Sequence, residues 1–473
     1  MVALEVELGP DLTAEEAGRI FERGKEAAVF AMLQLAMMLK SRGALVEPSP
    51  STPSGMIAAF QKPTVPTKGK RKKRPGAKLG HAGHRRAAPE RIDRYEEHRA
   101  EVCPDCGGEL TRCSETRTRY VEDIPEDLAP QVTEHTIHRD WCPQCRCKVE
   151  PKIGDALPGS MLGNRVLVLS AFLHFSLGNT LSQIVDVFNF HLQLKLTSGG
   201  LMQMWQRLAL RLEPWYEQLQ AEGLNSAVLH ADESGWRVNG KTHWLWCFSN
   251  PDLTYYMIDR CRGGPALAKF FITEFEGTLV SDFWGAYNGV ECALRQTCLV
   301  HLLRDLETVE KYKPHDGDWP DFAKKLRRLV GDAIRLWKRQ DELDVETYQS
   351  RSGRFPQRLD DLIHTPWSHP EAQRLIKRLR RHADDLFTFL EQDGVPFDNN
   401  HAERAIRPAV IMRKNSYGNR SDRGAETQSI LMSLFRTLKQ RDLDPIQTTL
   451  QALAEQLTTG QLPPLPPRHA SDG

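Results

Sequence analysis

Three short acidic segments, far apart along the chain, hold the residues best suited to catalysis. Asp232 and Asp282 each follow a short apolar run of the buried-strand type. Glu403 lies in a segment typical of a helix start, because Asp398 and Asn399 can cap it. Three carboxylates gathered at one place repel one another, and hard divalent cations such as Mg²⁺ prefer oxygen ligands of this kind. These segments therefore predict a shared metal site.

The segment at residues 398–408, Asp-Asn-Asn-His-Ala-Glu-Arg-Ala-Ile-Arg-Pro, is the most specific of the three. With the other two it resembles the DDE transposases, and in particular the insertion sequence 66 family, over roughly residues 65 to 450. The resemblance implies an RNase H-like α/β fold whose metal-binding catalytic triad is Asp232, Asp282 and Glu403. Two neighbouring acids, Glu233 and Glu426, compete for these roles.

Phosphodiester transfer in such a family implies two Mg²⁺ or Mn²⁺ ions, ~3.5–4 Å apart. We expect Asp232 to bridge both ions, and Asp282 and Glu403 to complete one coordination sphere each. Six further residues are expected to contact phosphates or to orient the helix of Glu403: His301, Arg304, Asn399, Asn400, Arg404 and Arg407. For His301 a purely structural role stays open, because a histidine at a strand end is often only a packed residue.

Paired cysteines give the second strong pattern. Cys103 and Cys106 form one Cys-Pro-x-Cys motif, and Cys142 and Cys145 form another, so that each pair can supply two thiolates to one tetrahedral Zn²⁺. Alternating residues between the pairs predict hairpin strands, including one at residues 132–138. Four thiolates leave no open coordination position, which indicates a structural zinc ribbon. Four buried cysteines without metal are the alternative.

Composition separates a basic arm from a balanced remainder. The chain has 473 residues and a net charge of +1, yet residues 68–86 hold nine Lys or Arg and no acid. We expect the arm to bind DNA phosphates, chiefly through Lys70, Arg71, Lys72, Lys73 and Arg74. A solvated linker would have a similar composition. With no long apolar segment and no signal sequence, we expect a soluble cytoplasmic protein, associated with the nucleoid and not with a membrane.

Two helical regions could serve either DNA or packing. A helix over about residues 14–40 could dimerise as a coiled coil or dock on the chain. A block over about residues 164–220 resembles a helix-turn-helix, whose second helix would start at Thr197 or Ser198. Because few cations face outward there, a pair of packed helices that braces the catalytic domain is an equal alternative.

The expected domain order follows from these motifs. The core is predicted as strands at residues 228–232, 242–249, 254–259, 278–282 and 296–300, with a helix near 266–275. The predicted domains are a helix (1–45), a Pro-rich tether and basic arm (46–90), a zinc-ribbon-like module (91–155), a helical domain (160–222), the first part of the core (223–305), a helical insertion (306–395), the second part of the core (396–455) and a tail (456–473).

The function implied by the resemblance is cleavage of transposon ends and joining of their 3′ ends to target DNA. Transposon-end DNA and target DNA are the expected partners, with a homo-oligomer assembled on DNA and accessory proteins of the element as further candidates. Two rival functions remain: a catalytically inactive zinc-ribbon DNA-binding regulator, and an RNase H-like nuclease that cuts without joining strands.

Overall fold

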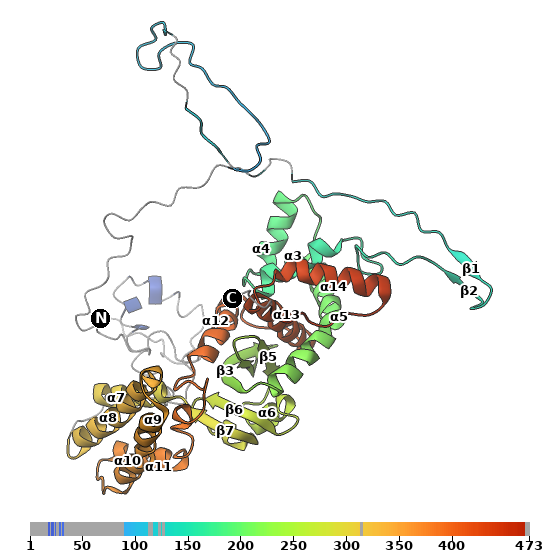
Figure 1. Cartoon of the computed structure of the whole chain (residues 1–473). Coiled ribbons are helices and arrows are strands. Elements are labelled where there is room, and N and C mark those ends of the chain that lie inside the picture. Colours follow the sequence, from blue (N-terminus) through green and yellow to red (C-terminus); the bar gives the residue numbers. More distant parts are fainter. Residues whose placement is uncertain are drawn as a thin grey trace. The chain divides into compact units, whose positions relative to one another are not determined.

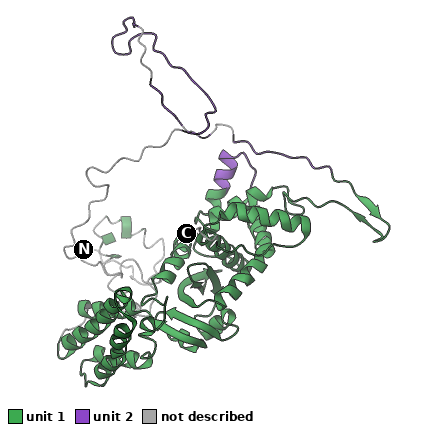
Figure 2. Ribbon diagram, in the orientation of Figure 1, with its two compact units in different colours: residues 1–62, 137–184, 197–473 green, residues 63–136, 185–196 purple. Residues whose placement is uncertain are grey.

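The computed structural model of the chain describes two compact units (Figure 2). Unit 1 spans residues 1–62, 137–184 and 197–473, and unit 2 spans residues 63–136 and 185–196. The described residues are 18, 20–22, 24, 28–29, 31–32, 89–111, 117–121, 124, 128–312 and 316–468. Most of the predicted N-terminal helix, and all of the basic arm with Lys70, Arg71, Lys72, Lys73 and Arg74, lie outside these residues.

A five-stranded mixed sheet forms the centre of unit 1 (Figure 1). Its strands are β3 (Val228–Val238), β4 (Lys241–Ser249), β5 (Thr254–Asp259), β6 (Phe275–Ser281) and β7 (Cys292–Thr297), in the order β5-β4-β3-β6-β7. β3, β4 and β5 form an antiparallel meander, while β6 runs parallel to β3 and β7 parallel to β6. This is the strand order of an RNase H-like sheet, as predicted.

The first strand is longer than predicted, so that Asp232 lies within it. Beyond Asp232 the chain keeps pairing with β4 as far as Val238, which faces Lys241 across a tight turn. The turn residues Asn239 and Gly240 have φ angles of 49° and 72°. Two successive positive φ angles match the right-handed twist of a hairpin, which lets both strands continue. The last strand, predicted at residues 296–300, begins and ends earlier, at Cys292 and Thr297, and Leu299 and Val300 already belong to the helix that follows.

Helices cover both faces of the sheet. α12 (Asn400–Ser416) packs on β3 and β4, and α13 (Asp422–Gln440) packs on β5. On the other face α6 (Gly264–Phe270) places Phe270 against Phe248, with ring centroids 4.0 Å apart. α14 (Pro445–Thr459) packs on α3 (Asn164–Phe175), a helix that precedes the sheet in the chain. The sheet is therefore buried on both sides, and its strands are correspondingly apolar.

The first and last helices of the block before the sheet pack on the core of unit 1. The block comprises α3 (Asn164–Phe175), α4 (Leu181–Asp186), the π-helical η2 (Val187–His191) and α5 (Ser198–Leu224). Thr197 caps α5 as predicted, accepting a hydrogen bond from the Gly200 N–H at 3.1 Å. α5 packs on α3 and α13, and the Trp205 indole donates to Ser170. The packed-helix interpretation thus describes α5, and a DNA-reading role for it stays a prediction.

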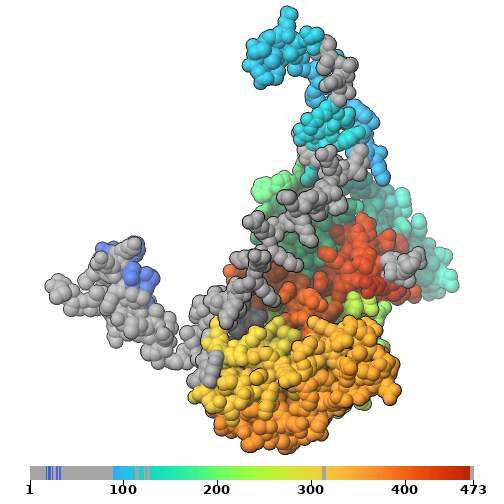
Figure 3. Space-filling view, turned by 60° about the vertical axis from the view of Figure 1, so that its left-hand side comes forward, coloured from blue at the N-terminus to red at the C-terminus, as the bar shows by residue number. Residues whose placement is uncertain are grey.

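The insertion between β7 and α12 is helical, as predicted. It contains α7 (Leu299–Tyr312), α8 (Trp319–Trp337), α9 (Val345–Ser352), α10 (Arg354–His364) and α11 (Pro370–Arg381). In Figure 3 these helices, coloured yellow to orange, pack against one another on the visible face. Their apolar core includes Val280 of β6 and Leu299 and Leu302 of α7. The insertion therefore shares one apolar core with the five-stranded sheet.

The cysteine-rich region contains less strand than predicted. β1 (Asp140–Cys142) pairs antiparallel with β2 (Cys147–Val149), which makes a short hairpin around the second cysteine pair. Residues 132–138, predicted as a strand, are extended and exposed without forming one. Alternating apolar and polar residues give a segment one apolar face, but they do not provide a neighbouring strand. A single segment without such a neighbour cannot form the backbone hydrogen bonds of a sheet. No helix in the described part of the chain could span a membrane.

Candidate active site

Two parallel strands bring the first two acids to one edge of the sheet. β3 and β6 are neighbours in register, with His230 opposite Val280. Asp232 and Asp282 each lie two residues beyond that pair, so the strands deliver them side by side. The Asp282 carboxylate accepts the Trp284 N–H at 2.8 Å, which holds the turn that leaves β6.

The carboxyl groups of the three predicted acids interact electrostatically. Burial raises the pKa of Asp232 well above its usual value, and the charges of Glu233, Asp282 and Glu403 raise it further. Burial also raises the pKa of Asp282, with a contribution from Glu403. The register of β3 with β6 places Asp232 and Asp282 at matching positions, and Asn399, four residues before Glu403, donates a hydrogen bond to the Ala231 carbonyl next to Asp232. That the three carboxyl groups share one site stays a prediction.

Glu403 is flanked by two residues from the helix that follows β7. Arg304 donates to its carboxylate at 3.1 Å, and the His301 Nε2 atom lies 3.8 Å from the same oxygen. Burial lowers the pKa of His301, and the Glu403 charge opposes that shift. Because His301 and Arg304 are three residues apart on α7, one helix face presents both to the carboxylate.

Asn399 fixes the start of α12 against β3. It is 1 % exposed, its amide donates to the Ala231 carbonyl at 2.8 Å, and its Oδ1 atom lies 3.0 Å from His230 Nδ1. Its side chain does not cap the helix; the Asp398 carboxylate does, by accepting the Asn400 N–H at 3.1 Å. Arg404 and Arg407 lie on the exposed face of α12.

A buried cluster beside the acids was not predicted from the sequence. We call it the clamp, and it consists of Glu233, Trp244, Arg262, Trp284 and Tyr287. Glu233 accepts from Arg262 at 2.8 Å through one oxygen and from the Tyr287 hydroxyl at 2.6 Å through the other. The Arg262 guanidinium lies over the rings of Trp244 and Trp284, 4.4 and 3.9 Å from their centroids. No local pattern predicts such a clamp, because its members come from four separate segments.

The clamp bears on the competing acids. Both carboxylate oxygens of Glu233 have partners in the clamp, and burial, with a contribution from Asp282, raises the pKa of Glu233 to about 7. Glu426 is exposed on α13, and its charge acts on Tyr216. Both carboxylate oxygens of Glu403 also have a partner, Arg304, at 3.1 and 3.5 Å, but Glu403 is less buried than Glu233. The triad of Asp232, Asp282 and Glu403 stays a prediction.

The donor chemistry of the triad fits a hard divalent cation. Mutual repulsion contributes to the raised pKa of Asp232, and a bound cation would relieve that repulsion. The side chains are gathered without being at ligand spacing: within the described ranges, no group of three or more His, Cys, Asp or Glu is arranged to hold a metal ion.

Each described cysteine pair forms a turn suited to thiolate ligands. In the first, the Gly107 N–H donates to the Cys103 carbonyl at 2.8 Å, and the N–H groups of Cys106 and Asp105 lower the pKa of the Cys103 thiol. In the second, the Cys145 N–H donates to Cys142 Sγ at 3.4 Å and lowers the pKa of that thiol. Backbone donors that favour thiolates are what a zinc ligand pair requires.

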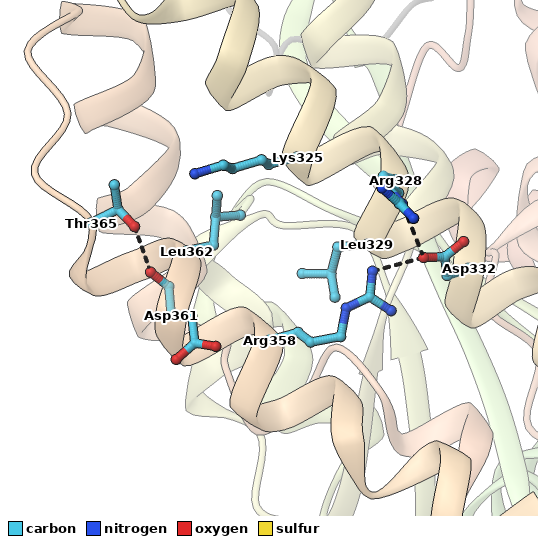
Figure 4. Close-up of a pocket in the computed structure, with 8 residues that line it drawn as sticks. All are labelled: Lys325, Arg328, Leu329, Asp332, Arg358, Asp361, Leu362 and Thr365. Atoms are coloured by element: carbon cyan, nitrogen blue, oxygen red, sulfur yellow. Dashed lines mark hydrogen bonds and ion pairs between the residues drawn. The ribbon is translucent and has the colours of Figure 1, made fainter.

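A separate pocket of about 500 Å³ lies between α8 and α10 (Figure 4). Arg358 of α10 lies 2.7 Å from Asp332 of α8, and Arg328 lies 3.9 Å from Asp332 along the same helix. The lining holds three cations against two acids, and none of its residues belongs to the carboxylate site. We assign it no catalytic role.

Two family models match this chain. The family model described as "Transposase IS66 family" matches residues 159–427, more than half of the chain, and includes all three acids. The model "zinc-finger binding domain of transposase IS66" matches residues 100–146, which include all four paired cysteines.

Three proteins of Sinorhizobium fredii (strain NBRC 101917 / NGR234), each described as uncharacterized, are similar to this chain. Protein y4qI is 24% identical over 81% of this chain and 75% of its own length. Protein y4jD is 23% identical over 76% of this chain and 75% of its own. Protein y4hP is 22% identical over 73% and 68%.

Proposed function

Because this chain belongs to the IS66 family of transposases, we propose that it cleaves transposon ends and joins their 3′ ends to target DNA. The observations that support the proposal are the register of β3 with β6, which puts Asp232 and Asp282 at matching positions, and the hydrogen bond from Asn399, four residues before Glu403, to the Ala231 carbonyl next to Asp232. Carboxylates assembled in this way serve phosphoryl transfer by holding divalent cations.

The proposed reaction has two steps at one site. Water attacks the phosphorus at the transposon end and the 3′ oxygen leaves; that 3′-OH then attacks a target phosphate, and a new 3′ oxygen leaves. Asp232, Asp282 and Glu403 would hold Mg²⁺ or Mn²⁺. The bound cations would activate the attacking oxygen and stabilise the leaving one.

The surrounding residues have supporting roles in the proposal. Arg304 and His301, which flank Glu403, would contact the scissile phosphate. Asn399, tied to β3, would keep Glu403 in place, and the turn that Asp398 and Asn400 form would fix the first turn of its helix.

Zinc and DNA binding belong to the same proposal. Cys103, Cys106, Cys142 and Cys145 would hold one structural Zn²⁺, which would order the residues between the two pairs. The basic arm would add salt-sensitive affinity for DNA backbone. We further propose that the protein acts in the cytoplasm on the nucleoid and assembles as a homo-oligomer on transposon-end DNA.

The first prediction concerns the triad. Asp232→Asn, Asp282→Asn and Glu403→Gln should each reduce strand cleavage roughly 10²–10³-fold or more, the loss expected when a group that stabilises transition-state charge is removed. DNA binding should persist. The measurement is cleavage and joining of a donor plasmid that carries the DNA flanking the coding sequence, with Mg²⁺ or Mn²⁺ added.

Glu426→Gln is the matched control, since Glu426 is an exposed acid on α13 that should not affect cleavage. A triple variant that still cuts would end the proposal. Cleavage without joining would identify a nuclease, and binding without cleavage by the unaltered chain with either metal would identify a regulator.

A further inference from the structure

The outer face of α12 presents a line of exposed residues that starts beside Glu403. Arg404, Arg407, Ile411 and Lys414 are exposed and are spaced by three, four and three positions, which places them on one side of the helix. The opposite side, with Ala402, Ala405, Ile406, Ala409 and Met412, is buried. The exposed line therefore leads from the carboxylate site to the far end of the helix.

Positive charge is concentrated along this segment. Residues 404–423 hold five exposed cationic residues, Arg404, Arg407, Lys414, Arg420 and Arg423, against the single acid Asp422, while a sixth, Arg413, is part-buried and donates to Ser234 and Gly235. The whole chain is nearly neutral, with a net charge of +1. Such local excess is the electrostatic mark of a surface for a polyanion.

Tyr417, at the end of the line, has an unusual conformation. Its φ is 60°, in the left-handed region, and the residue is 83% exposed. Left-handed helix ends usually carry Gly or Asn, because a larger L-residue is strained there. Because the Tyr417 ring is in solvent, packing of the ring does not offset this backbone strain.

The backbone around Tyr417 is firmly held. The Tyr417 N–H donates to the Arg413 carbonyl at 2.9 Å. Two residues on, the Asn419 N–H donates to the Arg237 carbonyl at 2.9 Å, and the Asn419 side chain accepts from the Trp236 indole at 2.7 Å. The exposed ring is therefore presented from a fixed position beside the end of β3.

We propose that this surface, the α12 track (Arg404, Arg407, Lys414 and Tyr417), binds a DNA strand that runs to the carboxylate site, and that the Tyr417 ring stacks on a base. The proposal rests on the proposed function. Three cations would contact successive phosphates, and an exposed aromatic ring offers a stacking platform for any base. Ile411 lies between them and adds apolar surface.

The distance along α12 predicts which nucleotide the Tyr417 ring would stack on. Glu403 and Tyr417 are fourteen positions apart, which is ~21 Å along a helix that rises ~1.5 Å per residue. Stacked nucleotides advance ~3.4 Å per step, so Tyr417 would meet a base roughly six nucleotides from the scissile phosphate. A base must leave its duplex partner or lie at a strand end to stack there, which favours single-stranded DNA or a frayed end.

The test uses the full-length Asp232→Asn chain without added Mg²⁺ or Mn²⁺, so that binding is measured apart from cleavage. The probe is a labelled 20-nucleotide single-stranded DNA of mixed sequence. Tyr417→Ala should weaken its binding roughly 5- to 100-fold, the range for loss of one stacked base, while Tyr417→Phe should bind normally. Tyr417→Gly should weaken binding equally and yet raise the melting temperature, because glycine relieves the strain.

The cations are tested by salt dependence. Arg404→Ala, Arg407→Ala and Lys414→Ala should each lower the slope of log affinity against log salt by about 0.7. Lys439→Ala, an exposed cation on α13, is the control and should leave the slope unchanged. Unchanged affinity in both Tyr417→Ala and Tyr417→Gly, or unchanged slopes, would overturn the proposal even if the chain proves an active transposase. The proposal would also be overturned if the Tyr417, Arg404, Arg407 and Lys414 variants bound DNA normally but no longer bound an acidic protein.

Discussion

At the scale of single residues, neighbours in sequence have different environments. Asp232 and Glu233 are adjacent on β3, yet the Asp232 carboxylate accepts the Glu233 backbone N–H, while the Glu233 carboxylate accepts from Arg262 and Tyr287. Arg262 in turn lies over Trp284, two residues after Asp282. The clamp therefore ties β3, which carries Asp232, to the turn after β6, which carries Asp282, and its loss should affect both stability and the candidate site.

The prediction for the clamp is a large loss of stability. Arg262→Ala leaves the 4% exposed Glu233 carboxylate without its ion pair and should cost about 3–5 kcal/mol. Glu233→Gln in the same chain should recover part of that loss, because it removes the buried charge. Urea unfolding measures both, and Arg339→Ala in the exposed pair with Glu342 should stay within about 0.5 kcal/mol. Equal effects of Arg262→Ala and Arg339→Ala would show that the clamp carries no special energy.

At the scale of elements, α12 connects the site to the sheet at both of its ends. Asn399 holds its first turn to β3 through Ala231, and Asn419 holds the chain after its last turn to Arg237 and Trp236. Between these anchors the helix packs small side chains such as Ala405 and Ala409 on the strands. Small residues let the helix approach closely, so Glu403 is set by a rigid element instead of a loop.

The prediction for this element concerns the glycine after Tyr417. Gly418 has φ of 108°, and an added Cβ would clash with the Arg237 carbonyl. Gly418→Ala should therefore destabilise the chain by about 2 kcal/mol or more and displace the end of α12. Gly199→Ala, on the open first turn of α5, should be neutral or slightly stabilising. Thermal unfolding compares the two; similar melting temperatures would show that the close contact at Gly418 is not rigid.

At the scale of the whole molecule, the helical insertion shares the apolar core of the sheet in unit 1. It separates Asp282 from Glu403 in sequence, but its apolar residues form one cluster with Val280 and Leu299. Trp319 is 1% exposed at the start of α8 and belongs to that cluster. A shared core predicts that insertion and sheet unfold together.

The prediction at this scale is one cooperative transition for sheet and insertion. Trp319→Ala should cost about 3–5 kcal/mol, through lost burial and the cavity it leaves, and should lower the melting temperature of the sheet as well. Trp141→Ala, at a 62% exposed position in β1, should change little. Calorimetry of both variants is the measurement. Two separate transitions in Trp319→Ala, with the sheet unaffected, would contradict the shared core.

Local patterns predicted much of this architecture. Apolar runs that end at acids predicted β3 and β6, and the Asp-Asn-Asn-His-Ala-Glu segment predicted the start of α12. These predictions were possible because the signals for a strand or a helix start lie in residues close together in the sequence. The same reasoning was wrong for residues 132–138, where alternation had no partner strand, and it ended β3 too early because pairing with β4 continues past Asp232.

The amino-acid sequence alone determined which chemistry this protein can perform, since acids and paired cysteines carry their chemical character wherever the chain places them. Tertiary structure alone decided which acid is occupied by Arg262, which helix face remains exposed beside Glu403, and that the insertion joins the core. The physical reason is that these features are contacts between segments far apart in the chain. Their energies depend on distance and burial, which no local pattern encodes.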